Sequence, residues 1–226
     1  MAKKYLFDQE QTKSKLADFF RHEKADITSF GSAVNQTFEA YVFAKVIDWF
    51  KNKGFTVDVQ NPSIDGQQVF RLKYSTRGAP KNYTHVLVQK GIERYQIRHQ
   101  LRVSTARQRG KREYNANICC DISIILDKDL KNFKTDEAIP NDWLMAFGEV
   151  KHMSAFAELI ASFIGLTHEL KPKKLKRIRT KNYSTEVLPC FLYVSGYLNP
   201  TAKGIIETIE NRKFDLDIYS IDRPIR

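Results

Sequence analysis

One stretch restricts the fold of this chain more than any other, the run ICCDISIIL from Ile118 to Leu126. Its length and its β-branched residues predict a strand that is buried on both faces, as in the middle of a sheet. Asp121 stands in the centre of this run. Because an unpaired charge in such a core is costly or forces a pKa shift, another group must compensate it.

Strands and helices alternate along the rest of the chain. Apolar residues at helical spacing predict helices at residues 37–51, 154–170 and 201–212. Further strand patterns fall at residues 55–59, 69–72, 85–89, 95–103, 144–152, 187–194 and 216–221. Each helix between two strands returns the chain in the same direction. The pattern therefore predicts an α/β fold whose sheet is partly parallel.

The length and composition favour one globular domain, with a core at residues 31–221 after a helical N-terminal extension at residues 1–30 of the 226. No apolar run approaches the roughly 20 residues of a membrane span, and the first residues lack the apolar stretch of a secretion signal. We therefore expect a cytoplasmic protein with no membrane partner. Three cysteines, Cys119, Cys120 and Cys190, lack zinc-ligand spacing and are predicted to be reduced core residues.

The charge of the chain favours an anionic partner. Its 37 Lys and Arg residues against 26 Asp and Glu give a formal net charge of +11, which should attract nucleic acid, although anionic membrane surfaces attract the same charge. A polar stretch before the strand of Asp121 is predicted to bind nucleic acid through four cations, Arg107, Arg109, Lys111 and Arg112. A second basic segment, residues 171–181, fits a phosphate-binding loop and a solvated loop equally well.

Glu149 and Lys151 repeat the problem of Asp121 on the otherwise apolar strand LMAFGEVKH. Being two positions apart, they point to the same face of the sheet. If the two strands are neighbours, Asp121 and Glu149 present oxygen ligands to Mg²⁺, for which Mn²⁺ is expected to substitute. Lys151 would then orient a water or neutralise charge in a phosphodiester transition state. The alternative is an ion pair between Glu149 and Lys151 at a sheet edge.

Glu39 adds a third acidic group. In the helix predicted at residues 37–51 its spacing from Val42, Phe43 and Val46 turns it toward the packed side, where a helix seldom places a glutamate. If this helix packs beside the two strands, Glu39 can bind a second ion or hold a metal-bound water.

The order of these features resembles the PD-(D/E)xK nuclease superfamily, which includes many restriction endonucleases and Holliday-junction resolvases. The shared order is a helix with a glutamate, strands, a strand with an aspartate, a strand with Glu-x-Lys, and then helix, strand, helix and strand. The matching residues, over about residues 31–221, are Glu39, Asp121, Glu149 and Lys151. Cys120 stands where the family has proline, and the two acids lie 149 − 121 = 28 positions apart, which implies an inserted hairpin or loop.

The resemblance implies a restriction-endonuclease-like mixed β-sheet core flanked by helices, with Mg²⁺-dependent hydrolysis of phosphodiester bonds. It also implies that the backbone carbonyl of Val150 binds the metal. We expect a DNA endonuclease of the restriction, defence or repair type. Double-stranded DNA is favoured by the resemblance alone, and a homodimer is expected because cutting two strands calls for two sites.

Two other functions compete with the nuclease. One is a non-catalytic module that keeps the nuclease fold as a scaffold for binding nucleic acid. The other is an interaction protein whose charge only keeps it soluble. An interaction protein of this kind would have no use for carboxylates on buried strands.

Overall fold

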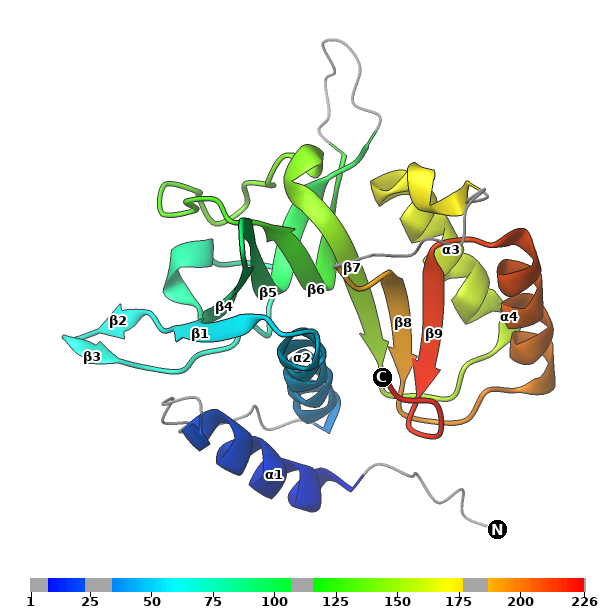
Figure 1. Ribbon diagram of the computed structural model, residues 1–226, viewed down its shortest axis with the longest axis horizontal. Helices are drawn as coiled ribbons and strands as arrows, with labels where there is room; N and C mark the ends of the chain where they lie inside the picture. The colour runs from blue at the N-terminus through cyan, green and yellow to red at the C-terminus, as the bar shows by residue number, and fades with distance from the viewer. Residues whose placement is uncertain (1–7, 23–33, 107–115, 177–186, 226) are drawn as a thin grey trace.

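A computed structural model of the chain describes residues 8–22, 34–106, 116–176 and 187–225 (Figure 1). Its centre is a seven-stranded sheet in the order β1-β4-β5-β6-β7-β8-β9. The strands are β1 (Thr56–Gln60), β4 (His85–Lys90), β5 (Glu93–Ser104), β6 (Asn117–Leu126), β7 (Leu144–Lys151), β8 (Cys190–Val194) and β9 (Leu216–Ser220). A separate hairpin contains β2 (Ser63–Ile64) and β3 (Gln67–Gln68).

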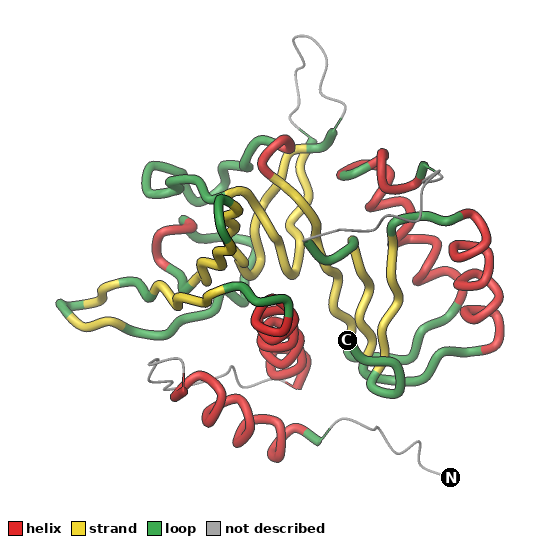
Figure 2. The backbone as a smooth tube through the Cα atoms, in the orientation of Figure 1, coloured by secondary structure: helices red, strands yellow, loops and turns green. Residues whose placement is uncertain are grey.

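The α-helices of the described residues are α1 (Gln9–His22), α2 (Val34–Asn52), α3 (Ala157–Leu170) and α4 (Pro200–Arg212). Three short 3₁₀ turns, η1 (Pro80–Asn82), η2 (Asn141–Trp143) and η3 (Pro172–Leu175), lie in the connections. Figure 2 shows that the stretch between β3 and β4 is loop apart from η1. No helix in these parts of the chain is both long and apolar enough to cross a bilayer.

The sheet is mixed. From β1 to β7 neighbouring strands are antiparallel, whereas β7, β8 and β9 are parallel because α3 and α4 carry the chain back between them. The prediction of an α/β fold with a partly parallel sheet is confirmed. The predicted strand at residues 118–126 is the inner strand β6, and that at residues 144–152 is its neighbour β7.

Helices cover both faces of the sheet. On one face α2 packs through Phe43, whose ring centroid lies 6.1 Å from that of His99 on β5. On the other face α3 packs through Phe163, whose ring centroid lies 5.8 Å from that of Phe147 on β7. The helix α1 lies outside α2 (Figure 1) and contributes the buried residue Phe20 to the same hydrophobic core.

Two sequence expectations have a clear outcome. The strand expected at residues 69–72 is wrong, because a loop satisfies its backbone: Thr84 donates its N–H to the carbonyl of Arg71 and accepts the N–H of Arg71 on its hydroxyl. Phe70 and Leu72 are nevertheless buried. The cysteines are free thiols as expected: Cys120 and Cys190 are buried, and Cys119 is half-buried.

Candidate active site

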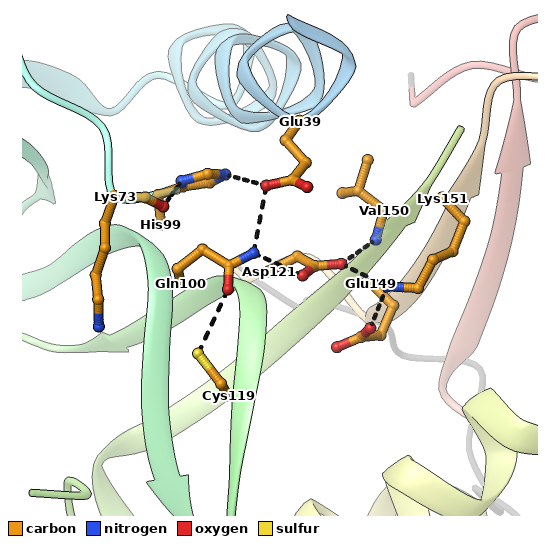
Figure 3. A network of polar contacts seen from close by, with 9 residues as sticks. All are labelled: Glu39, Lys73, His99, Gln100, Cys119, Asp121, Glu149, Val150 and Lys151. Atoms are coloured by element: carbon orange, nitrogen blue, oxygen red, sulfur yellow. Dashed lines mark hydrogen bonds and ion pairs between the residues drawn. The ribbon is translucent and has the colours of Figure 1, made fainter. Parts of the chain in front are cut away.

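The strand β7 changes its neighbour at Gly148. From Leu144 to Gly148 it pairs with β6, and from Gly148 to Lys151 it pairs with β8. Asp121 directly precedes Ile122, the first residue of β6 that pairs with β7, and therefore meets a part of β7 that has no ladder partner on that side. The Asp121 carboxylate fills the position, since its Oδ2 accepts the backbone N–H of Val150 at 2.8 Å (Figure 3).

Gly148 is required at this divergence. The ring of Phe191 on β8 lies across it, and a Cβ atom at position 148 would stand 2.2 Å from Phe191 Cζ. Such a contact is impossible without a shift, so glycine alone lets β8 approach β7 this closely.

Lys151 joins the two carboxylates. Its Nζ lies 2.9 Å from Asp121 Oδ2 and 3.0 Å from Glu149 Oε2 (Figure 3). Asp121 is 8% and Glu149 is 7% exposed, which confirms the predicted burial. The ion pair between Glu149 and Lys151 that the alternative expects is present, but β7 is an inner strand of the sheet and the same ammonium also contacts Asp121.

The electrostatics of this group follow from burial and proximity. Burial and the nearby Asp121 carboxylate raise the pKa of Glu149 to about 7, although the Lys151 ammonium opposes both. For Lys151, burial lowers the pKa, but the carboxylates of Glu149 and Asp121 outweigh it and raise the pKa above its ordinary value. Lys151 is therefore a permanent cation beside two close acids.

Glu39 reaches the same cluster from α2. The structure brings it to Asp121 through Gln100, whose Nε2 donates to Asp121 Oδ1 at 2.8 Å and to Glu39 Oε2 at 3.3 Å. Glu39 Oε2 also lies 3.0 Å from Nε2 of His99. The four residues proposed from the sequence, Glu39, Asp121, Glu149 and Lys151, thus belong to one network (Figure 3).

Sequence reasoning missed Gln100 and His99. Gln100 has a backbone φ of 51°, a left-handed conformation within the strand β5, and such strain persists only where surrounding structure enforces it. His99 is fixed on its other side, since its Nδ1 lies 2.6 Å from the carbonyl of Lys73 and a carbonyl can only accept. The one sequence feature that could have indicated them is that two polar residues, His99 and Gln100, stand next to each other inside a predicted strand.

The residues present fit a hard divalent cation. No group of three His, Cys, Asp or Glu side chains in the described ranges has the arrangement of a metal site. Mg²⁺ needs only one or two protein carboxylates because it keeps several waters, and Asp121 with Glu149 supplies two. In an extended strand the N–H and C=O of one residue point toward the same neighbour. The carbonyl of Val150 therefore points to the side of its N–H, which is bonded to Asp121.

The basic segments have different outcomes. Arg107, Arg109, Lys111 and Arg112 lie outside the described residues, so their role in binding nucleic acid stays a prediction. In the described part of residues 171–181, Lys171 Nζ donates to the carbonyl of Leu144 at 2.7 Å, and Lys174 is ion-paired with Asp215. These two lysines serve the fold, which favours a structural role for them over phosphate binding.

Comparison of the chain with protein-family models, with curated protein sequences and with solved structures gives no match. The function is therefore inferred from the side chains themselves and from the order of the elements that carry them.

Proposed function

We propose that this protein is a Mg²⁺-dependent nuclease that hydrolyses phosphodiester bonds in DNA. One observation carries the proposal: Lys151 Nζ lies within 3.0 Å of both Asp121 and Glu149, on two inner strands, where the three charges have no obvious structural purpose. A hydrophobic set of similar volume would stabilise such a core as well or better. Charges kept at this cost are typical of sites that perform chemistry.

The roles of the residues follow from their contacts. A Mg²⁺ ion held by Asp121, Glu149 and the carbonyl of Val150 would polarise the phosphate and make a bound water more acidic. Lys151, kept charged by its neighbours, stabilises negative charge that develops on the phosphate oxygens. Glu39 acts through Gln100, whose amide fixes the orientation of the Asp121 carboxylate.

The element order supports a restriction-endonuclease-like core. A helix with Glu39 precedes antiparallel strands, Asp121 and the Glu-x-Lys motif stand on adjacent strands, and α3, β8, α4 and β9 follow. Double-stranded DNA as substrate, cleavage within the strand and a homodimer with two sites belong to the proposal through the resemblance. The net charge of +11 suits a polyanionic substrate.

A cleavage assay tests the proposal. Purified protein is incubated with supercoiled plasmid, linear duplex, single-stranded DNA and RNA, with Mg²⁺, Mn²⁺ or chelator. We expect metal-dependent nicking or cutting of duplex DNA, reduced about 100-fold or more by Asp121→Asn and by Lys151→Met. Two matched controls, Asp217→Asn on β9 and Lys90→Met on β4, make the same chemical changes on strands away from the cluster and should cleave like the wild type.

The outcomes separate the competing functions. Cleavage that survives both Asp121→Asn and Lys151→Met would end the site assignment. Binding of DNA without cleavage under every metal condition would favour the non-catalytic module instead. A protein that neither binds nor cleaves nucleic acid, at low or high salt, would leave only the interaction protein.

A further inference from the structure

A cavity of about 530 Å³ lies between β1, β4, β5 and the segment that follows β6 at residues 127–131. This volume is within the range of sites for small molecules. None of Asp121, Glu149 and Lys151 lines it, so it is distinct from the candidate active site.

Arg98 is the unusual member of the cavity wall. Arg98 is only 6% exposed. Its guanidinium donates hydrogen bonds to two neutral oxygens, from Nε to Gln96 Oε1 at 2.7 Å and from Nη1 to the carbonyl of Pro80 at 3.2 Å. In the parts of the chain that the structure describes, no carboxylate lies within 4.0 Å of this guanidinium. A buried cation without an anion is costly, just as a buried carboxylate without a cation is.

Two acids, Asp127 and Asp129, line the cavity and act on the charge of Arg98, but neither lies within 4.0 Å of its guanidinium, and Asp127 is engaged elsewhere. Asp127 Oδ2 lies 2.9 Å from Arg94 Nη2, and its Oδ1 accepts Gln96 Nε2 at 2.7 Å. Burial lowers the pKa of Arg98 to about 10, which is still far above neutral pH, so the charge remains. An anionic ligand that enters the cavity would supply the missing partner.

The other residues that line the cavity indicate which kind of anionic ligand it suits. Exposed lysines stand at the mouth of the cavity, at positions 81, 128 and 131. The space exceeds that of a bare phosphate ion, and its wall contains amide side chains, Gln60 and Asn61, and the ring of Tyr83. Amides and an aromatic ring suit the base and sugar that accompany a phosphate in a nucleotide.

We infer that this cavity binds a nucleotide through its phosphate group, with Arg98 as the buried ligand of that phosphate. A guanidinium can donate two parallel hydrogen bonds to phosphate oxygens, which an ammonium cannot. The nucleotide can be free or can be the 5′-phosphorylated end of a strand, since both present the same group. The inference requires no cleavage and stands independently of the proposed nuclease activity.

Calorimetry on the full chain in chelator tests the inference. The probes are inorganic phosphate, AMP, dAMP, and a four-nucleotide DNA strand with and without a 5′-phosphate. We expect binding of phosphorylated probes, weakened about tenfold or more by Arg98→Met. Lys131→Glu at the mouth should weaken binding, whereas Lys203→Glu, the same change on an exposed position of α4, should not.

The comparison among probes identifies the source of the phosphate. Tighter binding of the 5′-phosphorylated strand than of AMP or dAMP assigns the cavity to strand ends, and the reverse order assigns it to free nucleotides. The inference is overturned if the wild type binds no phosphorylated probe at millimolar concentration, or if Arg98→Met binds as the wild type does. Should Arg98→Met fail to fold, equal binding by Lys131→Glu and Lys203→Glu overturns it instead.

A purely structural role for Arg98 makes a different prediction. If Arg98 only fastens the carbonyl of Pro80, then Arg98→Met melts at a lower temperature and nucleotide does not change the melting temperature of the wild type. If Arg98 awaits an anion, nucleotide raises the melting temperature of the wild type and not that of Arg98→Met. The melting curves thus separate the two roles.

Discussion

Gln100 donates a hydrogen bond of 2.8 Å to the carboxylate of Asp121 from a backbone conformation that glutamine rarely adopts, with φ at 51°. The same amide nitrogen reaches Glu39 Oε2 at 3.3 Å. A single neutral side chain therefore separates two acids and satisfies both. The Gln100 amide thus links Glu39 on α2 to Asp121 on β6.

Substitution of Gln100 by glutamate tests this connection. The change keeps the shape but replaces the donor by a third carboxylate, so in chelator we expect Gln100→Glu to lose about 1–3 kcal/mol of unfolding free energy. Gln68→Glu, on the exposed strand β3, is the matched control and should stay close to the wild type. Denaturant unfolding measures both. Equal stability of the two variants would show that the Gln100 amide does not hold the acids together.

Gly148 should tolerate no side chain. A methyl group there would meet Phe191 Cζ at 2.2 Å in a fully buried site, so we expect Gly148→Ala to cost about 1–3 kcal/mol of unfolding free energy and to displace Glu149. Gly165→Ala is the contrasting variant, because nothing lies within 4 Å of a Cβ at this helical position. It should raise stability by about 0.5–1 kcal/mol. A neutral Gly148→Ala would contradict the close approach of β8 to β7.

The pH dependence of stability should reveal the Glu149 carboxyl. In the metal-free protein its pKa is about 7 against an ordinary value of 4.5, so the folded state holds this proton more tightly than the unfolded state. The resulting stabilisation is complete below pH 4.5 and is lost as pH rises through 7. In chelator the wild type should therefore lose melting temperature relative to Glu149→Gln across this window.

An exposed acid provides the control for the pH experiment. Glu207→Gln removes a carboxylate at an exposed position of α4 and should not reproduce the pH-dependent difference between the wild type and Glu149→Gln. If the difference in melting temperature between Glu149→Gln and the wild type were also the same at every pH, the raised pKa of Glu149 would be contradicted. The measurement needs no metal and no substrate.

The sequence predicts the main residues of this site because a charged residue in a buried strand can be recognised without knowledge of its contacts. ICCDISIIL and LMAFGEVKH read as buried strands, and the charges within them mark Asp121, Glu149 and Lys151 before any contact is known. The same reasoning places Glu39 on the packed side of a helix. These predictions are possible because a charge inside an apolar run is costly unless it has a partner or a task.

Other parts of the site are set by tertiary contacts that no local pattern carries. Gln100, with its left-handed backbone, makes its contacts with Asp121 and with Glu39 on α2, which are distant from it in sequence. The need for glycine at position 148 depends on where the ring of Phe191 lies. Arg98 is a charge inside a strand pattern, as Asp121 is, but the sequence analysis does not pick it out. The structure shows that its guanidinium has no carboxylate of the described residues within 4.0 Å and lines the cavity.

Direct titration with a divalent cation tests the central claim that Asp121 and Glu149 share one ion. Calorimetry with Mn²⁺ on the protein without substrate should give saturable binding. Asp121→Asn and Glu149→Gln should each weaken this binding about tenfold or more, while Asp217→Asn should match the wild type. A wild type that binds no Mn²⁺, or an Asp121→Asn variant that binds it as tightly as the wild type, would contradict the shared site.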